Sequence, residues 1–428
     1  METAAGVAER LRDRTVLITG ATGFIAKLLV EKTLRLQPPV RRMYLLVRAG
    51  DQASATERVR SEIMQLQIFR PLREKYQEHF SSWFWDKVYP VAGDVSLKNL
   101  GIGDAVLAED ILRETDIIVH MAAAVNFRER YDTALAVNTM GVKHVIEIAS
   151  RCTKLELLLV STAYVNGKES GIMLEKPLHQ YRSYDGQSDL DISGEIALAE
   201  AKLKELVCRS ASEDNIRRAM KKIGIQRTID TWVTNYGKGI LKVPVDIVVN
   251  AMLCIISYHP RDHSGLIYHI GSSIRNPLKI GDLIHIMLRY FSEKPFVGAD
   301  GEGIKLKQLI MPATMASFYE HMDIHYKLPL QDMARHGLLT TDEYDRYNHL
   351  KREYDFTMGV ADVFHPSTLF KRRFDDTNMQ RLITMMNLRD RELVLCDTKL
   401  INWEKYLMEI HIPGVMDCES REPTRARL

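Results

Sequence analysis

Short apolar runs alternate with amphipathic stretches through the first part of the chain. The runs have the length and the β-branched content of buried strands. They are residues 15–19, 43–48, 87–94, 116–120 and 155–162. Between them, stretches such as 25–34 and 53–67 repeat apolar residues at helical spacing. This β-α-β alternation predicts an α/β fold with a doubly wound parallel sheet and right-handed crossovers, which is a Rossmann-like domain.

The pattern changes in the second half of the chain. Residues 189–224 predict charged helix, and both signs alternate at i to i+4 spacing, which indicates a solvated face. From about residue 301 onward glycines are few and helical patterns dominate. The sequence therefore predicts an α/β domain over residues 1–290 and a smaller, mainly helical domain over 291–428. No linker or repeat marks the boundary, which is soft by tens of residues.

Composition narrows the class of protein. The chain has 428 residues, of which 46% are hydrophobic and 27% charged, and its formal charge is only +2, so the totals favour no nucleic-acid partner. Five widely spaced cysteines suggest a reducing compartment and no zinc knuckle. The first strand begins by Thr15 and the apolar run 245–258 is short for a bilayer, so we expect a cytosolic chain for which peripheral membrane contact stays open.

A glycine turn follows the first predicted strand. Gly20 and Gly23 would let the backbone approach a pyrophosphate, and Ala26 is small enough for the next helix to pack on the strand. The N-terminal N–H groups of that helix would face the anion. Because the motif lies between a strand pattern and a helix pattern, it predicts a dinucleotide site rather than an ordinary turn.

Two charged residues bear on the choice of nucleotide. Arg48 ends the second strand, where NAD-selective sheets usually place a carboxylate, so a cation there favours a 2′-phosphate and NADP(H). Asp51 lies close by and could compete, and Arg48 could also be a solvated strand end. Asp94 follows the third strand and could meet the adenine amino group, or it could form an Asx turn after Gly93.

Hydroxyl groups follow the fifth predicted strand. Ser161 and Thr162 would emerge at the carboxyl edge of the sheet, where doubly wound folds bind ligands. A hydroxyl there can donate to a developing alkoxide, and the alternative is a plain Ser/Thr strand end. The pairs His259–His263 and His321–His325 have i, i+4 spacing but no third ligand, so we predict no metal site.

Several of these segments together resemble one enzyme family, the plant fatty acyl-CoA reductases. In the first half they are residues 19–27, the strand ending at Arg48, the Gly93–Asp94 turn, 120–127 and 160–167; in the second half they are 374–378, 403–406 and 411–415. The resemblance covers nearly the whole chain and two domains in order. It implies an extended short-chain dehydrogenase/reductase that converts a long-chain acyl-CoA to a primary alcohol, through an aldehyde, with two NADPH.

The resemblance also assigns site residues. The implied catalytic hydroxyl is that of Thr162, with Ser161 as the alternate. The implied cofactor contacts are Thr19, Gly20, Thr22, Gly23, Phe24, Ile25, Arg48, Asp94 and Ala122. The resemblance leaves open whether the alcohol goes to wax, cuticle or pollen wall, and whether the chain contacts the endoplasmic reticulum as a peripheral protein.

One expected segment is missing. The family's catalytic Tyr-x-x-x-Lys should follow the charged helical region, but Gln226 runs straight into Arg227, and a smaller gap falls near 242–243. Tyr347 and Lys351 have the right spacing but follow no cofactor-binding strand, so we do not interpret them as catalytic. The sequence thus predicts a reductase by descent with little or no activity. The alternatives are a non-catalytic splice product or gene-model variant that binds nucleotide or a full-length sibling, and, last, an epimerase or dehydratase.

Overall fold

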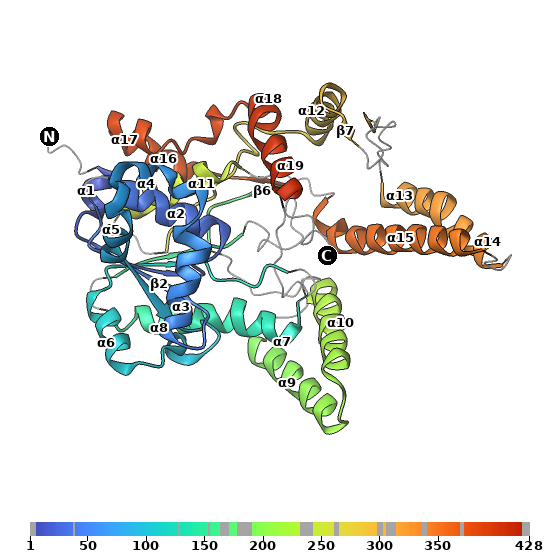
Figure 1. The fold of residues 1–428 in the computed structure, drawn as a ribbon, viewed down its shortest axis with the longest axis horizontal. Helices are drawn as coiled ribbons and strands as arrows, with labels where there is room; N and C mark the ends of the chain where they lie inside the picture. The colour runs from blue at the N-terminus through green and yellow to red at the C-terminus, as the bar shows by residue number, and fades with distance from the viewer. Residues whose placement is uncertain are drawn as a thin grey trace. The chain divides into compact units, whose positions relative to one another are not determined.

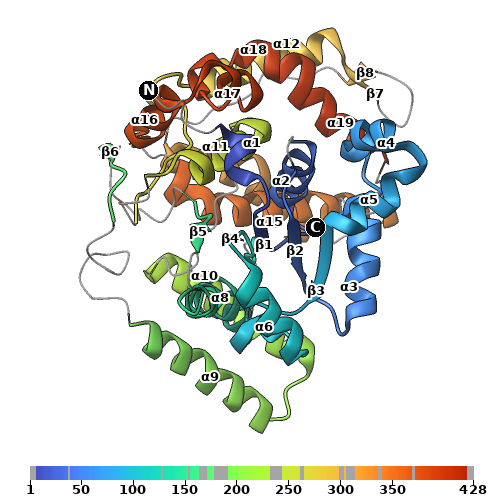
Figure 2. The same cartoon turned by 90° about the vertical axis from the view of Figure 1, so that its left-hand side faces the viewer.

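A parallel sheet forms the centre of the fold. The computed structural model describes residues 6–36, 39–126, 129–152, 155–162, 171–177, 191–231, 243–260, 265–297, 303–304, 314–335, 340–368 and 372–421. The strands are β1 (Thr15–Thr19), β2 (Arg42–Val47), β3 (Val88–Ala92), β4 (Ile117–His120) and β5 (Glu156–Leu159). They pair in the order β3-β2-β1-β4-β5, all parallel. Figure 2 labels the five strands, and Figure 1 shows the same sheet from a second side. The predicted doubly wound parallel sheet is confirmed.

Alternate residues of each strand feed two separate hydrophobic cores. In β1, Val16 and Ile18 join one cluster of buried side chains, while Leu17 joins the other. The first cluster includes α2 (Phe24–Arg35) and α11 (Val245–Tyr258), and the second includes α6 (Ala105–Glu114) and α8 (Gly141–Ala149). The sheet is therefore covered on both faces, which is why its inner strands are apolar throughout.

The remaining helices of the first part of the chain are mostly short. They are α1 (Val7–Leu11), α3 (Gln52–Val59), α4 (Arg70–Tyr76), α5 (Phe80–Lys87), α7 (Tyr131–Ala134), α9 (Ile192–Cys208) and α10 (Glu213–Thr231). The helix predicted over 53–67 is present from Gln52 to Met64, since the π-helical turn Arg60–Met64 continues α3 directly. The strand predicted over 155–162 is shorter, since β5 ends at Leu159.

The most apolar run after residue 240 is a core helix. In α11 the residues from Val249 to Ile255 are buried, and the Asn250 side-chain amide donates to the carbonyl of Leu395 at 2.9 Å. The polar residue inside this run thus has a partner, as a buried amide requires. Within the described part of the chain, no helix has both the length and the apolarity to cross a membrane.

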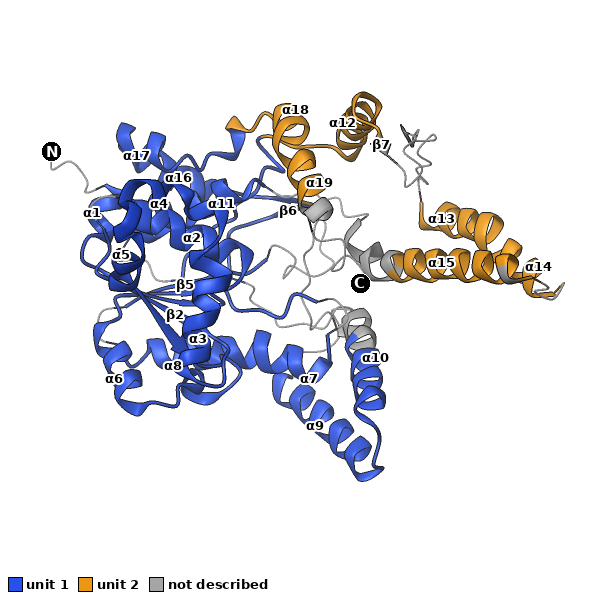
Figure 3. Cartoon of the chain, viewed as in Figure 1, with its two compact units in different colours: residues 1–275, 373–399 blue, residues 276–372, 400–428 orange. Residues whose placement is uncertain are grey.

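The chain divides into two compact units, and the division differs from the predicted boundary near 290. Unit 1 consists of residues 1–275 and 373–399, and unit 2 of residues 276–372 and 400–428, as coloured in Figure 3. The returning segment 373–399 carries β9 (Arg372–Phe374), α16 (Thr377–Met385) and α17 (Leu388–Leu393). A single boundary could not describe this, because Met379, Leu382 and Met386 of the segment belong to the same core as α11.

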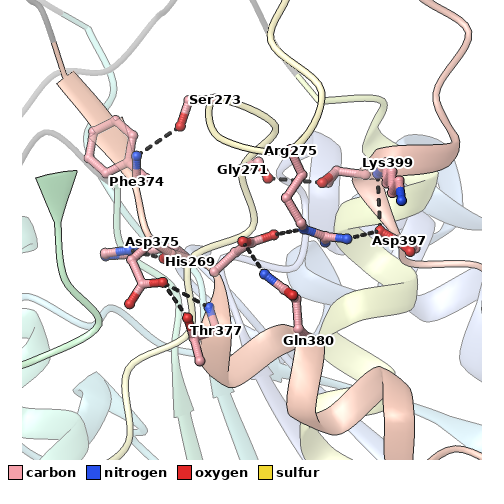
Figure 4. A network of polar contacts seen from close by, with 12 residues as sticks. His269, Gly271, Ser273, Arg275, Phe374, Asp375, Thr377, Gln380, Asp397 and Lys399 are labelled. Carbon is pink, nitrogen blue, oxygen red and sulfur yellow. Dashed lines mark hydrogen bonds and ion pairs between the residues drawn. The ribbon is translucent and has the colours of Figure 1, made fainter.

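A polar network fastens the returning segment to unit 1 (Figure 4). The Arg275 guanidinium donates to the carboxylates of Asp376 and Asp397, each at 2.7 Å. The backbone N–H of Phe374 donates to the Ser273 hydroxyl at 2.8 Å, and the Thr398 hydroxyl donates to the Gly271 carbonyl at 2.9 Å. Such contacts depend on partners ~100 residues apart, so no local pattern could reveal them.

A buried carboxylate joins the same segment to β6 (Gly171–Met173), which pairs with β9. Glu175 accepts from the backbone N–H groups of His269 at 2.7 Å and Asn378 at 2.5 Å. Burial raises the pKa of Glu175 to about 7.

Unit 2 is mainly helical, as predicted for the C-terminal region. Its elements are α12 (Ile280–Glu293), β7 (Phe296–Val297), β8 (Gly303–Ile304), α13 (Met315–Met322), α14 (Leu328–Arg335), α15 (Thr341–Thr368), α18 (Trp403–Lys405) and α19 (Ile412–Arg421). A small cluster of Leu283, Ile286, Tyr290, Leu407 and Ile412 packs α12 against the C-terminal turns. The Trp403 indole donates to the carbonyl of Asn276 at 3.0 Å.

Candidate dinucleotide site

The glycine turn after β1 lies tightly against the loop after β4. Gly20 has φ +67°, and a Cβ there would lie 2.7 Å from both the Cα and the N of Ala122. Any side chain at Gly20 would therefore strain the backbone and collide with main-chain atoms that cannot rotate away. The structure brings these two predicted cofactor residues together at the carboxyl ends of neighbouring strands, which is where open α/β sheets bind ligands.

The helix that follows presents an uncapped N-terminus. Gly23 is the N-cap of α2, no side chain caps the helix, and its first turn has no acidic residue. The backbone N–H of Gly23 donates to the carbonyl of Gly20 at 2.9 Å, which closes the turn. A 12-residue helix with free N–H groups and no competing carboxylate suits an anion.

The side chains around this turn differ in exposure. Thr22 and Ile25 are half-buried, Ala26 is buried, and Phe24 is 71% exposed at the first position of the helix. Ala26 packs α2 on the sheet as the sequence predicted. An aromatic ring so exposed beside the turn is available to cover a bound ligand.

A buried hydrogen bond joins the ends of β1 and β4. The Thr19 hydroxyl lies 2.7 Å from Nδ1 of His120, and the N–H groups of Met121 and Ala122 donate to the same hydroxyl oxygen at 3.3 and 3.4 Å. Burial lowers the pKa of His120 to about 4, so its imidazole is neutral at pH 7 and can accept the Thr19 proton. Thr19 thus supports the floor of the site rather than opening toward a ligand.

Asn138 holds the loop after β4 and was missed by the sequence reasoning. Its side-chain oxygen accepts from the N–H of Ala124 at 2.8 Å, and its amide donates to the carbonyl of the same residue at 3.2 Å. The side-chain amide thus pairs with both the N–H and the C=O of one residue, as a neighbouring strand would. An Asn inside a helical pattern could have signalled this, since Asn is unfavourable there without a partner.

Arg48 is exposed at the end of β2. Among the described residues, none forms a hydrogen bond or ion pair with its guanidinium. Asp51, the acid that could compete, caps α3 instead and accepts from the N–H of Ser54 at 2.7 Å. That hydrogen bond holds the pKa of Asp51 below its usual value. The cation rather than the carboxylate is therefore free at the place where the ribose would lie.

Asp94 forms the turn that was its alternative interpretation. One carboxylate oxygen accepts from the backbone N–H of Ser96 at 2.9 Å and from the Ser96 hydroxyl at 2.7 Å. Gly93 precedes it where a Cβ would lie 2.5 Å from the carbonyl oxygen of Leu100. The turn needs both residues, and only the second carboxylate oxygen of Asp94 is left for a ligand.

Ser161 and Thr162 are exposed just beyond β5. Neither forms a hydrogen bond with another residue that the structure describes, and residues 163–170 lie outside the described part. The N–H of Val160 donates to the carbonyl of His120 at 3.0 Å, so β5 reaches the same edge of the sheet as the glycine turn. The predicted hydroxyl positions therefore share an edge with the predicted cofactor residues.

The two outer strands of the sheet differ in protection. In β3, Pro90 has no N–H, the Gln52 side chain donates to the Pro90 carbonyl at 2.5 Å, and it accepts from the N–H of Ala92 at 3.2 Å. In β5, all four residues are half-buried or exposed, whereas all four of β4 are buried. Within the described residues β5 has one neighbour, β4.

The described structure places no Tyr-x-x-x-Lys pair beside the glycine turn. Tyr347 and Lys351 lie in α15 of unit 2, and Lys351 pairs with Asp355. Two more pairs at this spacing escaped the sequence reasoning. Tyr290 and Lys294 belong to α12 and its end, with the ammonium 5.3 Å from the ring centroid, and Tyr164–Lys168 lies outside the described residues. Helix α10 continues without a break across residues 226 and 227.

Fold and site together define a dinucleotide-binding α/β oxidoreductase domain with a helical partner. Residues 18–223 and 335–418 match two family models, both described as Male sterility protein. The chain is 36% identical to "Fatty acyl-CoA reductase 1" of Arabidopsis thaliana, over 95% of this chain and 97% of that protein. It is 31% identical to "Alcohol-forming fatty acyl-CoA reductase" of Simmondsia chinensis, over 97% and 99%. The chain belongs to the fatty acyl-CoA reductase family, and a nicotinamide cofactor fits its site.

Two details of these comparisons matter for the site. The alignment with the Arabidopsis protein runs over 480 positions, more than the 428 residues of this chain, so the relative has residues that this chain lacks. Among solved structures, the terminal R domain from the myxalamid PKS-NRPS biosynthetic pathway matches with a TM-score of 0.50 and 18% identity, over 92% of this chain and 91% of that one. That likeness supports the fold alone.

Proposed function

We propose that this chain binds NADPH and descends from enzymes that reduce a long-chain fatty acyl-CoA to a primary alcohol, and that as written it reduces little or none. The observation that carries the binding is the contact of Gly20 with Ala122 beside the uncapped N-terminus of α2. The turn needs glycine, and the uncapped N-terminus of α2 offers N–H donors that would hold a pyrophosphate.

Preference for NADPH over NADH rests on Arg48. Its guanidinium is exposed and carries no partner among the described residues, while Asp51 is occupied as a helix cap. A 2′-phosphate would gain a charge-assisted hydrogen bond there, and such bonds are worth about 1.5–3 kcal/mol. An NADH ribose would instead lack the carboxylate that usually holds it.

The reduction itself would place negative charge on one carbonyl oxygen in two successive hydride transfers. Thr162, or Ser161, would donate a hydrogen bond to that oxygen. A tyrosine whose pKa is lowered by a lysine one helical turn away would supply the proton. The family position for that pair falls between residues 226 and 227, inside α10, and the continuous helix there supports a chain in which the segment is absent.

Binding and turnover can be tested separately. We expect the purified chain to quench or enhance NADPH fluorescence with saturable affinity, and Gly20→Val to abolish this. Incubation with NADPH and long-chain acyl-CoAs should yield no more alcohol than a boiled control. Alcohol from the chain as written would contradict the proposed inactivity, and its loss in Tyr164→Phe would then identify Tyr164 as the proton donor.

The rival function is a nucleotide-binding product that acts through a full-length relative. It shares the binding result but predicts that the chain changes the activity of the relative when the two are mixed. Unchanged activity of the relative at a tenfold excess of this chain would remove that candidate.

A further inference from the structure

The outer side of β5 has backbone groups that no described residue pairs with. The N–H groups of Glu156 and Val160 donate to the carbonyls of Asp116 and His120, each at 3.0 Å. Because the bonding direction alternates along a strand, the N–H and C=O groups of Leu157 and Leu159 point away from β4. This side of the sheet can therefore accept another strand.

The side chains of β5 add no protection. Leu157, Leu158 and Leu159 follow one another, without a proline or a lysine, and Leu159 is 41% exposed. The Glu156 carboxylate already pairs with Arg14 at 3.1 Å. This edge is apolar, and no described residue pairs with its outward N–H and C=O groups. Both properties favour pairing with a second chain.

We propose that β5 is an interface at which two copies of this chain pair antiparallel about a two-fold axis. With the axis at Leu158, Leu157 of either copy lies opposite Leu159 of the other. Both outward-facing residues then exchange N–H···O bonds with their opposite residues, which is the pattern of a hydrogen-bonded antiparallel pair. The two five-stranded sheets become one continuous sheet.

The sheet itself argues for a second copy and for a closed dimer. The opposite edge is not available, because Gln52 occupies the outward groups at Pro90 and Ala92 and Pro90 lacks an N–H. Among the edges of the five-stranded sheet, only β5 can therefore pair with the β5 of a second copy. A contact between identical surfaces closes after two copies, so pairing ends at a dimer and no fibre grows.

Sedimentation velocity over a range of protein concentrations tests this, and it does not depend on any nucleotide or substrate. The full chain should move from monomer to dimer as its concentration rises. Leu159→Lys places a charge opposite Leu157 and should raise the dimer dissociation constant roughly tenfold or more. Leu388→Lys is the matched control, since Leu388 is 80% exposed on α17 and should leave dimerisation unchanged.

A second measurement needs no variant. Hydrogen exchange of the amides of Leu157 and Leu159 should slow as the concentration of the unmodified chain rises, while that of Ala92 should not. A monomer at every concentration would overturn the proposal, as would an equal effect of Leu159→Lys and Leu388→Lys.

Discussion

The two edges of the five-stranded sheet in unit 1 are built in opposite ways. At β3, a proline removes one outward N–H, and the Gln52 amide substitutes for a neighbouring strand across the next peptide groups. At β5, three leucines lie half-covered, with outward backbone groups that no described residue satisfies. Edge protection of the first kind is what natural sheets use to stay monomeric. The composition of β5 is instead that of an interior strand.

This contrast separates what the chain retains from what it lacks. The side of the sheet from β3 to β4 has its helices, its tight turn and a dry floor at Thr19 and His120. The β5 side, where Ser161 and Thr162 emerge, lacks a second neighbour among the described residues. The side of the sheet that would bind the cofactor is therefore intact, whereas the side that would hold the substrate is not. This difference is the basis of the proposed function.

The largest expected effect comes from restoring the missing Tyr-x-x-x-Lys segment. Inserting between Gln226 and Arg227 a family segment that carries the Tyr-x-x-x-Lys pair should restore a general acid. General acids contribute typically about 10²- to 10⁴-fold in rate. Product analysis with NADPH and long-chain acyl-CoAs should show alcohol from the insertion variant, and less when the inserted tyrosine is replaced by phenylalanine. No gain from the insertion would contradict the view that the missing segment supplies the general acid.

The buried Thr19–His120 hydrogen bond between β1 and β4 gives the next largest effect, a dependence of stability on pH. His120 has a folded-state pKa of about 4, below its unfolded value of about 6.5. Between these values the unfolded chain binds more protons, so the stability from a neutral His120 is complete above pH 6.5 and is lost as the pH falls toward 4. The loss could reach about 3 kcal/mol, at 1.36 kcal/mol per pKa unit.

His120→Asn removes this titration, so the difference in melting temperature between parent and variant should narrow on acidification. Glu175 contributes the opposite slope, because its pKa is raised to about 7 and its stability contribution falls as pH rises through that value. It is common to both proteins and cancels in the difference. A gap between parent and variant that stays constant from pH 7 to pH 4.5 would contradict a buried neutral His120.

At the end of β2, Arg48→Ala should reduce the preference for NADPH over NADH. Loss of one charge-assisted contact should weaken NADPH binding roughly tenfold to a hundredfold and leave NADH binding nearly unchanged. Fluorescence titration with each nucleotide measures both constants. Arg60→Ala, at the start of the π-helical turn after α3, removes another exposed arginine and should alter neither. Equal weakening of both nucleotides by Arg48→Ala would show that Arg48 does not contact the 2′-phosphate.

The sequence predicted the side of the sheet from β3 to β4 better than the β5 side, and the reasons are physical. Strand β1, the Gly20 turn and α2 follow from local periodicity and the steric demands of glycine. Asp94 shows the limit, because an Asx turn and an adenine contact use the same residue type and only coordinates reveal the turn. The return of 373–399 to unit 1 depends on Arg275 pairing with Asp376 and Asp397, contacts that no local pattern encodes.

The smallest expected effect comes from removing the protection of the β3 edge, which should then exchange hydrogen as the β5 edge does. Gln52→Ala removes two hydrogen bonds to β3 at a cost of about 1–3 kcal/mol. Since the Ala92 N–H loses its acceptor, its hydrogen exchange should accelerate toward the rates of Leu157 and Leu159 in the monomer. Exchange measured at low protein concentration compares the two edges directly. Gln65→Ala is the control, since that side chain is exposed and forms no hydrogen bond with β3 in the described structure. If exchange at Ala92 stays slow without Gln52, then the side-chain amide is not what protects this edge, and the contrast between the edges must arise from Pro90 alone.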